Sequence, residues 1–255
     1  MATFLFDDIV FGPVNSRRLG NSLGINLLPV DSKVCTFNCV YCECGWTQGI
    51  NTELPAGSEI KQRMHNEFKR LHENHVPVDV ITFAGNGEPT LHPDFDLIID
   101  HTIKLRNDFF PAAKIAVLTN ATLLHKQAVN DALQKVEMPL LKLDSAIEST
   151  ARAMNQPQIT FDFQRHLENI RNFAGKRIIQ TMFVRFQKQG VLIDNTTEEE
   201  LSAWLQELDR IHPDLVMIYS IARDTPDSTV KAVPKSELKK IAARAEVSGH
   251  KTQVN

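Results

Sequence analysis

All four cysteines of this 255-residue chain, Cys35, Cys39, Cys42 and Cys44, lie within one ten-residue window. A disulfide framework spreads its cysteines along the chain so that they join distant segments. Four thiols in one loop instead indicate a ligand cluster in a reducing compartment, so we expect a cytoplasmic protein. The first three cysteines follow the spacing Cys-x3-Cys-x2-Cys.

This spacing bears on the kind of metal site that the thiols form. Zinc sites usually pair their ligands as Cys-x2-Cys with a second pair some distance along the chain, and this sequence has no second pair. An electron-transfer [4Fe–4S] cluster takes four cysteine ligands. Three cysteines from one loop would leave one iron of such a cluster with an open position. A zinc site or a structural thiol cluster remains the alternative.

The segment KVCTFNCVYCECGW at residues 33–46, with Tyr41 before the third cysteine, resembles the signature of the radical S-adenosylmethionine (radical SAM) superfamily. The resemblance implies that Cys35, Cys39 and Cys42 bind a [4Fe–4S] cluster whose open iron binds the amino and carboxylate groups of SAM. In that family an electron from the cluster cleaves SAM, and a 5′-deoxyadenosyl radical then abstracts hydrogen from a substrate. Cys44 lies outside the pattern. We interpret it as a bystander, the alternatives being a replacement ligand or a fourth zinc ligand.

A glycine-rich segment, TFAGNGEP at residues 82–89, is the second motif. Glycines let a backbone turn tightly and approach a ligand, although the segment read alone is also consistent with a plain turn. Beside the cysteine loop it resembles the GGE-type motif of the family, in which backbone groups and the glutamate meet the methionyl amine of SAM. The implied SAM-binding residues are Gly85, Asn86, Gly87, Glu88 and Pro89, with Asn86 at the middle position.

Further candidates lie where predicted strands end. The resemblance implies that Asn120 lines the SAM pocket and that Asp144 and Ser145 meet the SAM ribose, with a helix N-cap as the alternative for Asp144. Arg185 is a candidate for the SAM carboxylate or a substrate, or else a charge at a strand end. The predicted cofactor contacts outside the glycine motif are Tyr41, Asn120, Asp144, Ser145 and Arg185. The candidate substrate contacts are Arg17, Arg18, Asn195 and Arg223. For the first two, whose guanidinium groups suit phosphate or carboxylate, the alternative is a surface arm.

The elements that must position these residues alternate along the chain. Apolar runs predict strands at residues 23–29, 78–84, 114–119, 140–144, 178–186 and 215–219. Amphipathic segments predict helices at residues 58–75, 93–106, 126–136, 161–173, 197–211 and 235–247. Such alternation favours a parallel sheet of βα units, either a barrel or a doubly wound sheet. In both architectures the chemistry lies at the carboxyl ends of the strands.

With the resemblance included, we predict an α/β fold, a partial (β/α)6 TIM-like barrel with its parallel sheet open at one side. The sequence has no obvious linker, so we expect a single radical SAM domain over residues 1–255, with an N-terminal arm at residues 1–20 and a core at about residues 20–247. No apolar run approaches the ~18–20 residues that span a bilayer, so we expect no membrane partner.

No cysteine follows Cys44, so we expect no auxiliary cluster. The chain has no room for a flavodoxin-like domain, so we expect the electron to come from a separate flavodoxin or ferredoxin. The chain carries 28 basic and 31 acidic residues and a formal net charge of −3. The overall charge therefore does not indicate nucleic-acid binding.

Three stretches resemble a narrower branch of the superfamily: residues 11–20 (FGPVNSRRLG), 154–157 (MNQP) and 194–199 (DNTTEE). That branch includes the enzymes that build the wybutosine base on tRNA and bacterial relatives of unassigned activity. The function we predict is radical SAM chemistry in tRNA or nucleoside modification. The alternatives are the same chemistry on a small molecule or as an activase of a partner protein, and a non-enzymatic metal or redox protein with four cysteine ligands.

Overall fold

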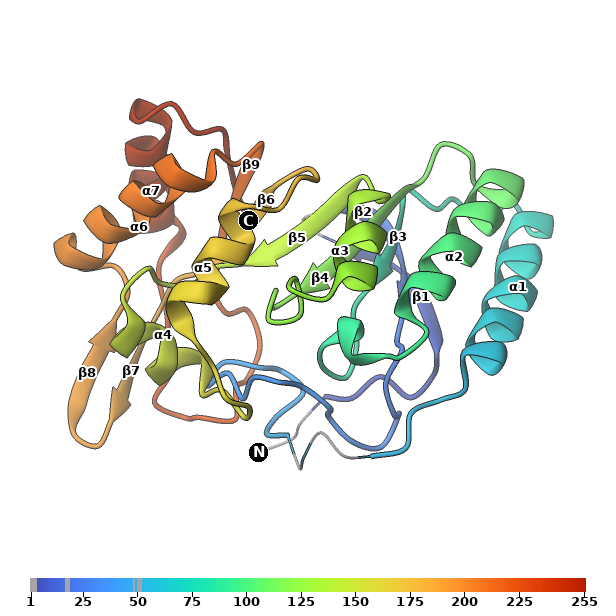
Figure 1. Cartoon of the computed structure of the whole chain (residues 1–255), viewed down its shortest axis with the longest axis horizontal. Helices are drawn as coiled ribbons and strands as arrows, with labels where there is room; N and C mark the ends of the chain where they lie inside the picture. Colours follow the sequence, from blue (N-terminus) through green and yellow to red (C-terminus); the bar gives the residue numbers. More distant parts are fainter. Residues whose placement is uncertain (1–3, 17–18, 48, 50–51) are drawn as a thin grey trace. The chain divides into compact units, whose positions relative to one another are not determined.

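The computed structural model describes residues 4–16, 19–47, 49 and 52–255 (Figure 1). The chain divides into two compact units. The N-terminal unit comprises Leu5–Cys35 and Thr47–Pro139, and the C-terminal unit comprises Thr36–Trp46 and Leu140–Asn255 together with Phe4. Arg17 and Arg18, two of the candidate substrate contacts, lie outside the described residues. The single-domain organisation stays a prediction.

The N-terminal unit contains four strands in the order β1-β2-β3-β4: β1 (Val10–Ser16), β2 (Gly20–Ile25), β3 (Val80–Phe83) and β4 (Lys114–Thr119). The strand β1 lies within the predicted arm and pairs antiparallel with β2, whereas β2, β3 and β4 are parallel. All four residues of β3 are buried, as its apolar sequence predicts for a strand covered on both faces. The register pairs Phe83 of β3 with Val117 of β4, so the segments that follow both strands leave the same edge.

The helices of this unit are α1 (Gly57–Glu73), η1 (Pro89–Leu91), α2 (Phe95–Phe109) and α3 (Gln127–Gln134). Helix α1 packs beside α2, and α2 beside α3. The buried face of α1 carries Ile60, Met64, Phe68 and Leu71, which follow the three- and four-residue spacing of an amphipathic helix.

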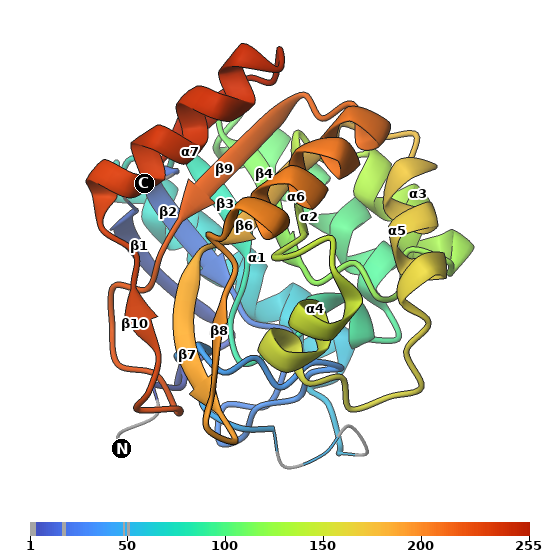
Figure 2. The ribbon, with the colours of Figure 1, turned by 90° about the vertical axis from the view of Figure 1, so that its left-hand side faces the viewer.

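The C-terminal unit has a parallel sheet in the order β5-β6-β9-β11. It also has a small antiparallel sheet in the order β10-β7-β8, whose three strands are labelled in Figure 2. The strands of the first are β5 (Met138–Lys142), β6 (Ile178–Met182), β9 (Leu215–Tyr219) and β11 (Thr252–Val254). Those of the second are β7 (Val184–Lys188), β8 (Val191–Asp194) and β10 (Lys231–Ala232). The helices are α4 (Glu148–Asn155), α5 (Phe163–Arg171), α6 (Glu198–Ile211) and α7 (Lys235–Val247).

One predicted strand, at residues 178–186, is wrong as a single element. Residues 178–182 form β6, and the chain then breaks at the buried Phe183, whose N–H donates to Tyr219 O at 2.9 Å. Residues 184–188 form β7, which pairs with β8 and β10 in the second sheet. The apolar run continues across the break because β6 is buried throughout and β7 buries Val184 and Phe186, and the sequence pattern carries no sign that the two strands belong to different sheets.

The predicted bounds of β4, β9 and α7 agree with the structure. The α6 start signal is also confirmed, because Thr197 Oγ1 accepts from Glu200 N at 3.3 Å. No helix in the described part of the chain combines the length and the apolar character needed to cross a membrane.

Candidate cofactor site

The cysteine loop, Thr36–Trp46, pairs with the last residues of α4 in the C-terminal unit. The N–H groups of Asn38 and Val40 donate to Asn155 O at 2.8 Å and Met154 O at 2.9 Å. Helix α4 ends because Gln156 adopts a left-handed conformation with φ of 41°, which turns the chain alongside the loop. The main chain on both sides of Cys39 is thereby fixed by hydrogen bonds.

The four cysteines carry thiols rather than disulfides. Cys39 is buried, and its Sγ donates to Asn155 Oδ1 at 3.3 Å within the C-terminal unit. Cys35 is buried in the N-terminal unit, where Asn120 Nδ2 donates to its Sγ at 3.6 Å. Cys42 and Cys44 are half-buried.

Among the residues with described positions, no three His, Cys, Asp or Glu side chains are grouped to bind one metal ion. The assignment of Cys35, Cys39 and Cys42 as joint ligands therefore rests on their spacing and on the family rather than on a gathered set of donors.

The glycine motif packs directly on the main chain that precedes Cys35. Gly85 and Gly87 have φ of 142° and 139°, values that residues with side chains rarely adopt. A Cβ on Gly87 would lie 1.8 Å from Val34 O, so no side chain fits there. Val34 N donates to Asn86 O at 2.9 Å, and Glu88 N donates to Val34 O at 3.0 Å. The glycines therefore allow a close backbone pairing that places the motif beside the first cysteine.

Asn86, at the middle position of the motif, is fully buried. Its Nδ2 donates to Phe6 O at 2.9 Å and to Pro29 O at 2.8 Å, and its Oδ1 accepts from Phe6 N at 2.9 Å. The side chain thus ties the chain before β1 to the chain after β2. This role explains an asparagine at this position, and the spacing of the motif does not predict it.

Glu88 is buried and accepts hydrogen bonds with both carboxylate oxygens. Its Oε1 accepts from Thr90 Oγ1 at 2.6 Å and Thr119 Oγ1 at 2.7 Å, and its Oε2 accepts from Asn120 N at 2.7 Å. Burial raises the pKa of the Glu88 carboxyl, and these hydrogen bonds only partly oppose that effect. The carboxylate therefore joins the ends of β3 and β4. Pro89, the next residue, is buried at the start of η1.

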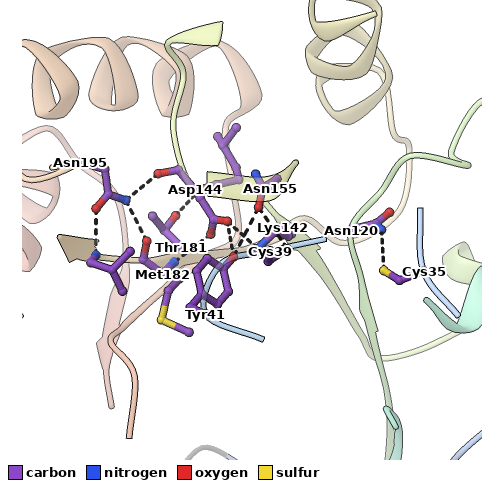
Figure 3. A network of polar contacts seen from close by, with 12 residues as sticks. Cys35, Cys39, Tyr41, Asn120, Lys142, Asp144, Asn155, Thr181, Met182 and Asn195 are labelled. Carbon is purple, nitrogen blue, oxygen red and sulfur yellow. Dashed lines mark hydrogen bonds and ion pairs between the residues drawn. The ribbon is translucent and has the colours of Figure 1, made fainter. Parts of the chain in front are cut away.

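Asp144 is the centre of the polar network in the C-terminal unit (Figure 3). Its Oδ2 accepts from Tyr41 Oη and forms an ion pair with Lys142 Nζ, and its Oδ1 accepts from Met182 N at 3.0 Å. Burial would lower the pKa of the Lys142 ammonium, but the Asp144 carboxylate together with Cys39 and Tyr219 outweighs burial, and the pKa is raised. The ammonium also lies 4.4 Å from the centroid of the Tyr41 ring. The network links the cysteine loop to the end of β5.

The helix-cap alternative for Asp144 is wrong, because α4 begins three residues beyond Ser145, with Ile147 at its N-cap position and no side-chain cap. Ser145 Oγ accepts from Ile147 N at 2.9 Å and donates to Glu200 Oε2 at 2.6 Å. Burial raises the pKa of the Glu200 carboxyl. Ser145 therefore holds the turn that follows Asp144.

Three other candidate residues have contacts within the C-terminal unit. Asn195 is buried, and its amide contacts Asp144 O, Met182 O and Val184 N at 2.8–2.9 Å. Arg185 pairs with Asp194 at 2.7 Å and with Glu237. Arg223, mostly exposed, pairs with Glu43 at 2.6 Å. Their roles toward a cofactor or substrate stay predictions.

Sequence reasoning missed Lys142 and Glu200 and gave Asn155 no site role. Lys142 lies two residues before Asp144, the spacing at which strand residues share a face, and this was the available signal. Glu200 lies 55 residues from Ser145 in the sequence, so no local pattern connects them.

The family model of the radical SAM superfamily matches residues 30–208 of the chain. The chain belongs to this superfamily. Among relatives of this radical SAM protein is the UPF0026 protein MJ1312 of Methanocaldococcus jannaschii, 30% identical over 90% of this chain and 68% of that protein. A protein named GTPase Obg from Brachyspira hyodysenteriae is 32% identical over 91% of this chain. The chain spans about a third of its length, 32%.

Solved structures also resemble this radical SAM protein. Streptococcus suis SuiB bound to S-adenosylmethionine gives a TM-score of 0.63 at 16% identity, over 91% of this chain and 50% of that chain. A radical SAM methyltransferase from Sphaerobacter thermophilus gives 0.67 at 12% identity, over 92% and 65%. Archaeal TYW1 gives 0.54 at 12% identity, over 89% and 72%.

This likeness confirms the predicted fold class, an α/β partial barrel. Membership of the superfamily confirms the predicted cofactors, a [4Fe–4S] cluster and SAM, at the level of the family. The residues assigned to each cofactor stay predictions.

Proposed function

We propose that this radical SAM protein is an enzyme that binds one [4Fe–4S] cluster through Cys35, Cys39 and Cys42. The observation that carries the proposal is the Cys-x3-Cys-x2-Cys loop with two of its sulfurs already in contact with buried amides, Cys35 with Asn120 and Cys39 with Asn155. When bound, the cluster supplies the electron that cleaves SAM and so generates the 5′-deoxyadenosyl radical that abstracts a substrate hydrogen.

Different residues of the chain would contact different parts of the cofactor. The glycine motif offers main-chain groups beside Cys35. The Glu88 carboxylate accepts from the main-chain N–H of Asn120 and so holds Asn120 in place. Asp144 and Tyr41 present oxygen atoms suited to the hydroxyl donors of a ribose. Lys142 and Met182 also donate to Asp144, and they orient the carboxylate before any ligand arrives.

The test is anaerobic reconstitution with iron and sulfide, then addition of dithionite and SAM and measurement of 5′-deoxyadenosine. We expect production by the parent chain and by Cys44→Ala, and loss of both cluster absorbance and product in Cys39→Ala. An intact, reducible cluster that yields no 5′-deoxyadenosine would contradict the proposal. Equal loss of cluster in both variants would instead support a four-cysteine metal protein.

For the substrate, we propose tRNA or nucleoside modification. The supports are the three stretches that resemble the wybutosine branch and the likeness in fold to archaeal TYW1. Phosphate contacts weaken steeply with salt, so we expect tRNA binding that falls as salt rises. Absence of binding even at low salt would favour a small molecule or a partner protein. We propose a flavodoxin or ferredoxin as the electron donor, and replacement of dithionite by a reduced flavodoxin tests it.

A further inference from the structure

Two buried asparagine side chains contact the sulfurs of two motif cysteines (Figure 3). Asn120 Nδ2 lies 3.6 Å from Cys35 Sγ in the N-terminal unit. Asn155 Oδ1 lies 3.3 Å from Cys39 Sγ in the C-terminal unit. Both asparagines are only 6% exposed. Amide contacts from two separate elements, each reaching a different cysteine sulfur, point to a role at the sulfur atoms themselves.

The position of each amide is set by other contacts. Asn120 Oδ1 accepts from Thr122 N at 3.0 Å and Thr122 Oγ1 at 2.8 Å, which directs its Nδ2 toward Cys35. Asn155 is the last residue of α4, and its main-chain oxygen accepts from Asn38 N at 2.8 Å. Neither side chain is needed for the backbone pairing of the cysteine loop, so substitution of the amides leaves that pairing available.

The contact at Cys39 changes when the cysteine binds iron. A cysteine ligand is a thiolate and has no proton to donate. Asn155 Oδ1, which can only accept a hydrogen bond, would then face a sulfur that also only accepts. A half-turn of the amide exchanges Oδ1 and Nδ2 with almost no change in shape. Tyr41 Oη, 3.5 Å from the same amide oxygen, tolerates this exchange because it donates its own proton to Asp144 and can accept one.

We propose that Asn155 and Asn120 are positioning residues that donate N–H···S hydrogen bonds to the cluster ligands Cys39 and Cys35 and raise the reduction potential of the cluster. Reduction adds negative charge to the cluster and its sulfurs, so an N–H dipole directed at a sulfur stabilises the reduced state more than the oxidised state. The inference rests on the proposed function, because it takes these cysteines as ligands.

The experiment is a redox titration of the reconstituted full chain, with dithionite as reductant and the reduced cluster measured by electron paramagnetic resonance. The variants are Asn155→Asp, which keeps the shape but loses the donor, Asn155→Leu, and Asn120→Leu. The matched control is Gln158→Ala, because Gln158 lies on the same segment but has an exposed side chain that donates to Gln156 O.

We expect each Asn155 variant to hold the same iron and sulfide as the parent chain. At a fixed potential near the parent midpoint we expect the ratio of reduced to oxidised cluster to fall about tenfold, which corresponds to a midpoint about 59 mV lower for a one-electron couple. We expect a shift in the same direction for Asn120→Leu and no shift for Gln158→Ala.

Two results overturn different claims. If the Asn155 and Asn120 variants bind the cluster with the parent midpoint, the inference fails and the proposed function stands. If the parent chain binds no cluster after anaerobic reconstitution, the proposed function fails and the inference with it. If either Asn155 variant loses its cluster, the midpoint of Asn120→Leu decides, since Asn120 follows β4 in the N-terminal unit, whereas the end of α4 pairs with the cysteine loop.

Discussion

The two units each bury one carboxylate of the candidate site, and they surround it with different partners. In the N-terminal unit, the Glu88 carboxylate accepts from two threonine hydroxyls and from the main-chain N–H groups of Thr90 and Asn120, all neutral donors. In the C-terminal unit, Asp144 faces the ammonium of Lys142 in addition to its neutral donors. One carboxylate is therefore held by hydrogen bonds alone and the other by an ion pair.

This difference determines how each unit responds to a lost partner. A buried ion pair that loses one member leaves an uncompensated charge, whereas a carboxylate held by neutral donors shares the loss among several hydrogen bonds. The ion pair lies in the unit that holds Cys39, Cys42 and Tyr41. We therefore expect the cysteine loop to depend more on Lys142 than the glycine motif depends on any one donor to Glu88.

The largest effect we expect is from Lys142→Met, which leaves Asp144 buried without its cation. Removal of one member of a buried pair costs about 3–5 kcal/mol, and urea unfolding of the cluster-free chain measures it. The double variant Lys142→Met/Asp144→Asn removes both charges and should recover part of that loss. If the double variant is as unstable as the single one, the cost comes from lost packing on Tyr41 rather than from the unpaired carboxylate.

The pH dependence of stability tests the surroundings of the same ion pair, because His166 lies beside it. It is buried beside Lys142 and Asp144, and burial with the nearby ammonium lowers its pKa to about 4. The unfolded chain binds this proton below its ordinary pKa of 6.5. Because the folded chain does not bind it until about pH 4, stability falls as pH drops through this window. The fall attributable to His166 is on the order of 3 kcal/mol.

The measurement is urea unfolding at several pH values between 7 and 4 for the parent and for His166→Phe. We expect the variant to lack this part of the acid loss. The exposed His65, changed to Gln, is the control and should leave the parent profile unchanged. A His166→Phe profile that follows the parent would show that the imidazole is protonated in the folded chain.

The comparison also shows what sequence patterns reveal about such a site. The spacing of three cysteines and the positions of Gly85, Glu88 and Asp144 at strand ends are local, and the sequence predicts them. The contact of Asn155 with Cys39 joins residues 116 positions apart, and the hydrogen bonds of Asn86 join residues 80 and 57 apart. Such contacts depend on tertiary packing, which no local periodicity encodes.

The same limit explains the error at Phe183. Hydrophobic periodicity reports burial. All of β6 is buried, and β7 begins with the buried Val184 and Phe186, so the run continues across the break. Which sheet each strand joins depends on partners that are distant in sequence. The prediction was therefore right about the buried run and wrong about its continuity.

The smallest effect we expect is from Glu88→Gln. The amide places an N–H donor where a carboxylate oxygen accepted a hydrogen bond, and the loss of that hydrogen bond lowers the stability by about 2 kcal/mol. Because the pKa of Glu88 in the folded chain is above its ordinary 4.5, its contribution to stability is full below pH 4.5 and is lost as pH rises through the raised pKa. The variant lacks this dependence, so the destabilisation measured by urea unfolding should be greater at pH 4.5 than at pH 8.

Glu137, a second glutamate of the N-terminal unit, is the control, because its pKa is shifted in the opposite direction. Burial raises its pKa, but the Ile115 N–H and the Arg106 guanidinium outweigh burial, and the net pKa is lowered. Its contribution is present above its ordinary pKa and lost as pH falls through the lowered one. Glu137→Gln should therefore cost more at pH 8 than at acid pH. If both variants show the same trend with pH, the distinction between a glutamate held by neutral donors and one held by a cation fails.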